Sequence, residues 1–279
     1  MPAHEVFHVM AGEPRPIGGL WPSEPGWQDD YGESMMAYGG YRVYADDTPD
    51  EPLIAEADFI DTSDDRDRYC PKDAIVDQDS QNSCLACATA QACQILLRFL
   101  GHKPEVLSIA DFYGRINGGR DQGGALEDAI VEIVKNGICS TKYADQWDWR
   151  KPTFKPGYEE DRRRHTPLKA WHCPTIQHVY SALQRRKVVV CGMDVDDSWK
   201  PDAQGVLGPR RTRGGGGHAQ CLFGMKSIGN VWHVGDINSW GTKNWGTDGK
   251  AWTHPSWLQF QKYPPFALGL LPEASDDPL

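Results

Sequence analysis

The sequence lacks several features that would assign a protein to a class at once. No stretch approaches the roughly 18 consecutive apolar residues that a membrane-spanning helix needs. Residues 1–8 have neither the basic region nor the apolar region of a secretory signal. A net charge of −10 argues against a nucleic-acid-binding protein, because neutralising phosphates requires clustered lysine and arginine. We therefore expect neither a membrane nor a nucleic acid among its partners.

The motifs of common cofactor and metal sites are also missing. The glycines 214–217 lack the Lys-Ser/Thr ending of a phosphate-binding loop. Cys84 and Cys87 form a C-x-x-C pair, but no second Cys/His pair at matching spacing completes a zinc site. A polar loop rather than a strand precedes the pair, which disfavours a redox site. We expect no metal and no organic cofactor.

Cysteine is present eight times, at positions 70, 84, 87, 93, 139, 173, 191 and 221. Three of these, Cys93, Cys191 and Cys221, lie inside apolar runs, where a free thiol behaves as a small hydrophobic residue. Together with the missing secretory signal, this favours reduced thiols and an intracellular or virion-associated protein.

The 279 residues are enough for one large domain or two lobes that share a cleft. Residues 1–66 are rich in Pro, Gly and Asp, and only short segments such as 38–44 fit a strand. We interpret them as an irregular extension that wraps the domain or contacts a protein partner. Residues 67–262 are predicted to form the folded domain, and 263–279 a loose, Pro-rich, acidic tail.

Apolar periodicity predicts the elements of this domain. A helix from Cys87 to about Leu100 has apolar residues on nearly all sides, so it is expected to be central and buried, with Gly101 as its stop. Further helices are predicted at 125–136 and 175–186, and strands at 188–195, 219–225, 231–237 and 250–253. The order predicts an α+β fold with a helical first lobe and a β-rich second lobe.

Four residues supply the parts that thiol-based acyl transfer requires. Cys87 would stand at a helix N-terminus, where the backbone dipole favours the thiolate. His218 can hold the proton of the thiol, and Asn238 can orient the imidazole. Gln81 lies six residues before Cys87, so its amide and the Cys87 backbone N–H would form an oxyanion hole.

Each of these residues also has an ordinary explanation. Cys87 could be an inert buried thiol, His218 a solvated histidine at a strand start, and Asn238–Gly241 a common turn. His233 is a competing base, but its position in the middle of a predicted strand favours a core or surface role. The combination of the residues, rather than any one of them, points to catalysis.

These segments resemble the papain-like cysteine peptidases, over residues 69 to 257. Residues 81–88 look like the family's Gln-Gly-Ser-Cys-Gly-Ser-Cys-Trp segment, while 217–219 and 238–241 look like its His and Asn segments. The resemblance implies a two-lobed papain-like fold. It makes Cys87 the nucleophile and His218 the general base and acid, with Asn238 as the orienting residue and Gln81 as the oxyanion donor.

Residues 121–139 look most like the bacterial and viral branch of this family. The resemblance implies that Gly123 and Gly124 present backbone groups to an extended substrate, with Trp240 also on the substrate-binding side. The segment Asn117-Gly118-Gly119 competes for the role of the paired glycines.

Three departures from the family pattern stand out. Ala88 follows the predicted nucleophile where the family usually has tryptophan. The usual disulfide partner of Cys84 falls near residue 116 or 121, and neither is a cysteine. The N-terminal region does not resemble a long helical inhibitory prosegment, so maturation by proteolysis is not expected.

The predicted function is thiol-dependent hydrolysis of peptide or isopeptide amide bonds, with a peptide or protein as substrate. The alternative from another class is a structural or interaction component of a larger assembly, such as a virus particle, on the same scaffold. A third possibility is an amidase acting on cell-wall peptide, or another thiol acyltransferase.

Overall fold

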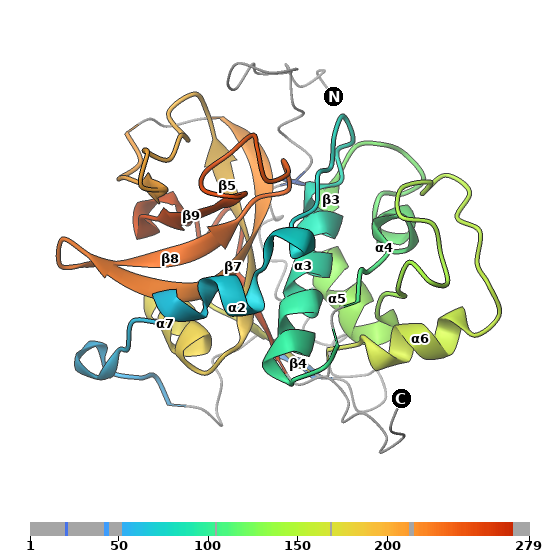
Figure 1. Ribbon diagram of the computed structural model, residues 1–279, viewed down its shortest axis with the longest axis horizontal. Helices are drawn as coiled ribbons and strands as arrows, with labels where there is room; N and C mark the ends of the chain where they lie inside the picture. Colours follow the sequence, from blue (N-terminus) through green and yellow to red (C-terminus); the bar gives the residue numbers. More distant parts are fainter. Residues whose placement is uncertain are drawn as a thin grey trace.

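Helix α3 (Cys84–Phe99) runs between a lobe of helices and a lobe built on a β-sheet (Figure 1). The computed structural model describes residues 20–21, 42–44, 52–103, 105–167, 169–211 and 215–269. The arrangement confirms the predicted α+β architecture with a helical lobe and a β-rich lobe. Within the described residues, no helix combines the length and apolar character needed to cross a membrane.

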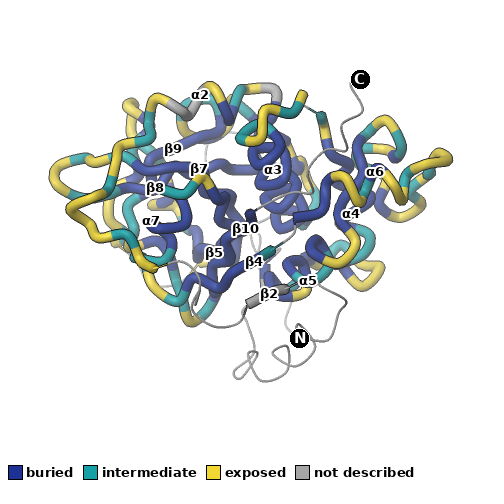
Figure 2. Tube along the Cα trace, turned by 90° about the horizontal axis from the view of Figure 1, so that it is seen from below, coloured by how far each residue is buried: buried dark blue, intermediate teal, exposed yellow. Residues whose placement is uncertain are grey.

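The central helix is buried from Cys84 to Leu97, as its apolar surroundings predict (Figure 2). It begins three residues earlier than predicted, so the expected start at Cys87 is wrong. The backbone N–H of Cys87 donates to the Ser83 carbonyl at 2.9 Å, which closes a helical turn before Cys87 is reached. Gly101 follows the end of the helix with a φ of +80°, in agreement with its predicted role as the stop.

The helical lobe contains α4 (Ile109–Ile116), α5 (Leu126–Asn136) and α6 (Tyr158–Arg164). The sequence predicted α5 to within one residue, whereas α4 and α6 were not predicted. Asp111 of α4 joins them, because it is buried, accepts from the Arg162 side chain of α6 and accepts from Cys139 N at 2.9 Å. A buried carboxylate with a guanidinium partner and a backbone donor is well satisfied.

The β lobe holds an eight-stranded sheet in the order β2-β4-β10-β5-β7-β8-β9-β6. Its strands are β2 (Arg42–Tyr44), β4 (Lys169–His172), β5 (Val188–Val195), β6 (Val206–Leu207), β7 (Gly216–Ile228), β8 (Val231–Ile237), β9 (Lys250–Thr253) and β10 (Phe266–Gly269). Strands β5, β8 and β9 have their predicted bounds, and β7 is longer than predicted.

Two cores lie on opposite sides of this sheet. On β7, the residues Ala219, Cys221 and Phe223 belong to the core shared with α3. Leu222, and Met225 beyond the register shift between Leu222 and Gly224, belong to a second core, which includes residues of helix α7 (Ile176–Gln184). This separation follows from the alternation of side chains along a strand.

The last described residues correct the prediction of a loose tail from position 263. Phe266–Gly269 form β10, which is buried and pairs antiparallel with both β4 and β5. A four-residue segment behind two prolines carries too little pattern to predict a strand. The remaining tail, 270–279, lies outside the described residues.

Part of the predicted N-terminal extension packs against the β lobe. Ile54 N donates to Ser181 Oγ of α7 at 3.0 Å, and Thr62 N donates to the Met225 carbonyl of β7 at 2.9 Å. The division at residue 66 stays a prediction.

We expect Leu268→Ala to lower the free energy of unfolding by about 2–5 kcal/mol, because Leu268 is fully buried within the sheet. The control Leu100→Ala, at a leucine 49 % exposed, should change it by less than about 0.5 kcal/mol. Urea denaturation followed by circular dichroism measures both. Equal effects of the two variants would contradict the place of β10 in the sheet.

Candidate active site

The loop before α3 is tied to the segment that carries Asn238. Gln78 N donates to the Ser239 carbonyl at 2.7 Å, and Gly241 N donates to the Val76 carbonyl at 3.1 Å. The Ser239 hydroxyl also donates to Gln78 Oε1. These bonds hold the N-terminus of the central helix beside the end of β8, so the two lobes meet there.

His218 and Asn238 are in direct contact. His218 Nε2 donates to Asn238 Oδ1 at 2.8 Å, and the same oxygen accepts from Ser239 N at 2.7 Å. An amide oxygen only accepts, so the proton of the neutral imidazole is on Nε2 and Nδ1 is bare. Nδ1 has no hydrogen-bond partner among the described residues. The imidazole is therefore oriented by one nitrogen and open for chemistry at the other.

Tryptophan rings enclose this pair. The Trp240 ring centroid lies 5.0 Å from that of His218, and Trp199 lies edge-on to both rings while stacking on Trp245. Burial lowers the pKa of His218 to about 4, with the hydrogen bond to Asn238 acting in the opposite direction. Trp240 is itself 1 % exposed, so its contact is with the imidazole. Its predicted substrate contact stays a prediction.

The two candidate cysteines lie in different surroundings. Cys84 is the first residue of α3, and the backbone N–H groups of Ala219, Leu85 and Cys84 itself lower the pKa of its thiol. Burial outweighs them and raises this pKa to about 11. Since Ala219 directly follows His218, the contact places the Cys84 thiol beside the histidine segment.

Cys87 lies one turn further into the helix. Its sulfur is 3.7 Å from Ser83 Oγ, and burial raises the pKa of its thiol well above the ordinary value. Its backbone N–H is bonded to the Ser83 carbonyl, so it is not available to an oxyanion as predicted. The structure brings together His218 and Asn238 from the predicted set, and it places Cys84 rather than Cys87 at the free end of the helix.

A second glutamine, Gln78, lies three residues before the predicted oxyanion donor Gln81. Gln81 is partly buried, and its backbone N–H donates to the Gln78 carbonyl at 3.1 Å. Gln78 is fully buried, lies six residues before Cys84, and donates from Nε2 to the Gln81 carbonyl at 2.8 Å. Gln78 and Cys84 were not among the candidates predicted from the sequence. The signals that could have added them are the repeated Gln-x₅-Cys spacing, Ala88 and the lack of a disulfide partner for Cys84.

An extended strand does pair at the predicted glycines, and it comes from the chain itself. Strand β1 (Leu20–Trp21) pairs in parallel with β3 (Gly124–Ala125). Gly123 precedes this strand with a φ of +81°. The competing glycines, Gly118 and Gly119, instead form an exposed turn with positive φ values.

Leu20 occupies the space next to the histidine segment. It is 2 % exposed, and a Cβ on Gly192 or Gly217 would overlap its side chain or its carbonyl, respectively. The ring of Tyr263 borders the same space. With this segment in place, both Cys84 and His218 are fully buried. Leu20–Trp21 is a short strand, and the expectation that the N-terminal region is not a long helical prosegment stays a prediction.

Other candidate groups lie apart from this centre. His233 is hydrogen-bonded through Nδ1 to the Val231 carbonyl and packs on the His254 ring, and neither contact involves His218 or Asn238. Glu105, Asp161 and His165 also lie close together, with His165 3.6 Å from each carboxylate, and burial lowers the pKa of this histidine.

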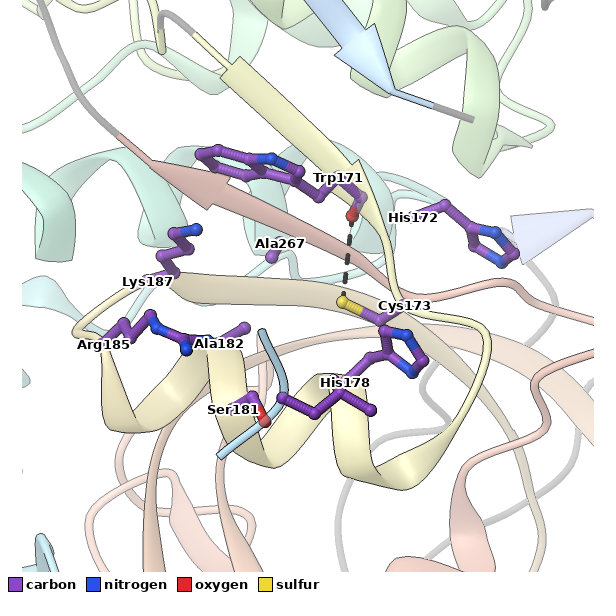
Figure 3. A pocket seen from close by; sticks show the side chains of 10 residues that line it. Trp171, His172, Cys173, His178, Ser181, Ala182, Arg185, Lys187 and Ala267 are labelled. Carbon is purple, nitrogen blue, oxygen red and sulfur yellow. Dashed lines mark hydrogen bonds between the residues drawn. The ribbon is translucent and has the colours of Figure 1, made fainter. Parts of the chain in front are cut away.

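A small cavity lies between α7 and the strands β4 and β10 (Figure 3). At the edge of the cavity, Lys187 Nζ lies 3.6 Å from the centroid of the Trp171 ring, and the Cys173 thiol donates a hydrogen bond to the Trp171 carbonyl. The cavity has a volume of about 20 Å³, which is room for roughly one water molecule. None of the predicted site residues lines it.

Neither a family model nor a curated protein matches the sequence. Among solved structures, xylellain, a cysteine protease from Xylella fastidiosa, is similar with a TM-score of 0.60 and 20 % identity, over 78 % of this chain and 94 % of that one.

Two further structures are similar. One is procathepsin B S9 from Trypanosoma congolense (TM-score 0.59, 17 % identity, over 83 % of this chain and 86 % of that one). The other is digestive procathepsin L 3 from the Tenebrio molitor larval midgut (TM-score 0.59, 16 % identity, over 89 % and 82 %). The chain therefore has the papain-like fold, as the resemblance implied.

We expect the buried imidazole to make stability depend on pH. The pKa of His218 is about 4 in the folded chain against an ordinary value of 6.5, so between these values the unfolded chain binds a proton that the folded chain does not. The free energy of unfolding should therefore fall, relative to that of His218→Gln, as the pH drops from 6.5 to 4. Urea denaturation at several pH values tests this, with Leu100→Ala keeping the slope of the parent. Parallel slopes for parent and His218→Gln would contradict the burial of the imidazole.

Proposed function

We propose that the chain is a cysteine peptidase that cleaves peptide or isopeptide amide bonds, with Cys84 as its nucleophile. The observation that carries this proposal is the bare His218 Nδ1, whose ring is held through Nε2 by Asn238. A nucleophile beside a base that a third group orients is the arrangement of thiol-based acyl transfer. The similarity in fold to cysteine proteases supports it.

The residues of this centre act one after another in the reaction. His218 Nδ1 takes the proton of the Cys84 thiol, and the thiolate attacks the carbonyl carbon of the amide. The oxyanion is stabilised by the Cys84 backbone N–H, free because it lies in the first turn of the helix, and by Gln78 Nε2. Each such donor contributes roughly 10²- to 10³-fold in rate. His218 then protonates the leaving amine, and water releases the acyl group from sulfur.

In this proposal the burial of Cys84, His218 and Leu20 corresponds to a covered form of the centre. With Leu20 in place, burial raises the pKa of Cys84 to about 11 and lowers the pKa of His218 to about 4, so thiol and imidazole are both neutral. Admitting water reduces the cost of charging both groups, and the helix N-terminus then favours the thiolate. The covered centre is therefore unreactive, and displacement of Leu20 activates it.

The segment around Leu20 acts as an internal inhibitor in this proposal. It pairs with Gly124, the edge to which an extended substrate would add, so substrate and segment exclude each other. Two of the similar structures are likewise described as the pro-forms procathepsin B and procathepsin L 3. The bacterial character of xylellain fits the predicted bacterial and viral branch, which stays a prediction.

Alanine at each cysteine of the pair tests the identity of the nucleophile. Cys84→Ala should lower kcat/KM for peptide hydrolysis by at least about a thousandfold, since it removes the attacking atom. Cys87→Ala, the matched control one helical turn away, should stay within about threefold, because a buried thiol packs as a small hydrophobic group. A fluorogenic peptide library measures both, on protein freed of the inhibitory segment.

The opposite ranking, with Cys87→Ala inactive and Cys84→Ala active, would restore the nucleophile first expected. Absence of activity in the parent and both variants, with no alkylation of Cys84 by iodoacetamide, would favour the alternative of a structural component on a peptidase scaffold.

A substitution at Leu20 tests whether this residue blocks access to Cys84. Leu20→Asp places a charge in an apolar space, and losing the burial of one leucine shifts the covered-to-open equilibrium by about 1.5–3 kcal/mol. The rate of Cys84 alkylation and of peptide hydrolysis should rise by about ten- to a hundredfold. Leu53→Asp, at a leucine 47 % exposed in the same N-terminal region, should leave both rates unchanged. Equal rates for parent and Leu20→Asp would show that Leu20 does not block the centre.

A further inference from the structure

Two buried polar residues lie behind the His218 imidazole on the same sheet. Gln220 lies on β7, two positions after His218. Asp236 lies on β8, two positions before Asn238, which is the first residue after that strand. Side chains two positions apart on a strand share a face, so Gln220 projects on the side of His218. Asp236 pairs in register with Leu222, the next residue of β7 on that face. Both polar side chains are 0 % exposed.

Hydrogen bonds connect this pair to the imidazole. With the orientation of the Gln220 amide that matches every donor to an acceptor, its nitrogen donates to Asp236 Oδ1 and to the Ile237 carbonyl, each at 2.8 Å. Its oxygen then accepts from His218 Nε2 at 3.1 Å. The imidazole N–H therefore lies between two amide oxygens, those of Asn238 at 2.8 Å and of Gln220.

We propose that Gln220 and Asp236 are positioning residues for His218, with Asp236 anchoring the Gln220 amide as a second acceptor for the imidazole N–H. This role rests on the proposed peptidase function, in which Nδ1 must stay bare to receive the thiol proton. Two acceptors on Nε2 favour that tautomer over its alternative more than one acceptor does. They also stabilise the imidazolium that forms when the thiol gives up its proton.

Packing alone does not explain a carboxyl group at position 236. A buried carboxyl is costly without partners, and an apolar residue would fill the same space. Thr253 Oγ1 of β9 donates to Asp236 Oδ2 at 2.9 Å, and Gln220 supplies the bond to the other oxygen. No ion pair with Asp236 is present among the described residues. Every polar contact of this carboxyl therefore leads either to β9 or toward His218.

The titration of this carboxyl gives the network a measurable signature. Burial raises the pKa of Asp236 to about 8, while the Thr253 hydrogen bond acts in the opposite direction. Two titratable groups interact electrostatically with it, the thiol of Cys191 on β5 and, across the sheet, that of Cys221 on β7, and burial raises the pKa values of both thiols well above the ordinary value. Ionisation of Asp236 near pH 8 strengthens its hydrogen bond from the Gln220 amide nitrogen. The polarised amide then has a more negative oxygen, which is a better acceptor for the imidazole N–H.

Nuclear magnetic resonance of His218 tests the network without requiring activity. The full chain carries Cys84→Ala and ¹⁵N-labelled histidine, and the imidazole resonances of His218 are followed from pH 6 to pH 9. We expect the Nε2–H tautomer and a shift of its resonance with a midpoint near pH 8. Asp236→Asn should abolish the shift, and Gln220→Met should abolish it and raise the fraction of the Nδ1–H tautomer about three- to tenfold.

Leu222→Ala is the matched control, because it opens a cavity on the same face, in register with Asp236, and should leave the shift in place. Persistence of the shift in Asp236→Asn, or an unchanged tautomer in Gln220→Met, would overturn the proposal. If Gln220→Met does not fold, the isosteric Asp236→Asn decides alone.

A kinetic measurement separates this proposal from the proposed function. In active protein, Gln220→Met should lower kcat about tenfold with KM within about twofold, since the residue acts on the imidazole and not on the substrate. A chain with the expected resonances but no peptide hydrolysis would sustain the network and refute the peptidase. A chain that hydrolyses peptides with kcat unchanged by Gln220→Met would refute the positioning role and sustain the peptidase.

Discussion

The hydrogen bond between His218 and Asn238 is the interaction around which the site is organised. It joins the β7 residue His218 to the first residue after β8, and the antiparallel pairing of those strands brings the two positions together. A bond of this kind is stronger where water is excluded, and the rings of Trp240 and Trp199 exclude it. The orientation of the imidazole, and hence the identity of its reactive nitrogen, depends on this one contact.

The loop before α3 ties the helical lobe to this centre, in addition to the core that α3 shares with the sheet. Gln78 and the segment Ser239–Gly241 exchange backbone and side-chain hydrogen bonds just before α3 begins. The loop thereby sets where the first turn of the helix lies relative to β7. Because the first turn of a helix carries N–H groups without intrahelical acceptors, the junction places the Cys84 thiol at the positive end of the helix dipole.

Much of the fold could be predicted from the sequence because long elements carry their own periodicity. Strands β5, β8 and β9 and helix α5 are runs of apolar residues at strand or helix spacing, and the structure has them close to their predicted bounds. Helix α6 has the sequence Tyr-Glu-Glu-Asp-Arg-Arg-Arg, which shows no apolar period, so the local sequence does not predict a helix there. Strand β1 has two residues, and only its partner β3 defines it.

The nucleophile is harder to predict from the sequence than the fold, for a physical reason. His218 and Asn238 follow from their segments, but the choice between Cys84 and Cys87 depends on where α3 starts. Ser83 makes no side-chain capping bond, so the sequence carries no strong signal for that start. A shift of three residues turns a side chain by most of a helical turn, and it moves both the thiol and its glutamine partner.

The place of β10 has a consequence for synthesis of the chain on the ribosome. Strand β10 is inserted between β4 and β5, although both precede it by about 70 residues or more, so neither strand has its hydrogen-bonding edge filled until residues 266–269 emerge. Nascent chains that have already released β7 and β8 therefore still expose open strand edges, which invite aggregation or chaperone binding. Completion of the sheet is therefore a late step in the folding of the chain during its synthesis.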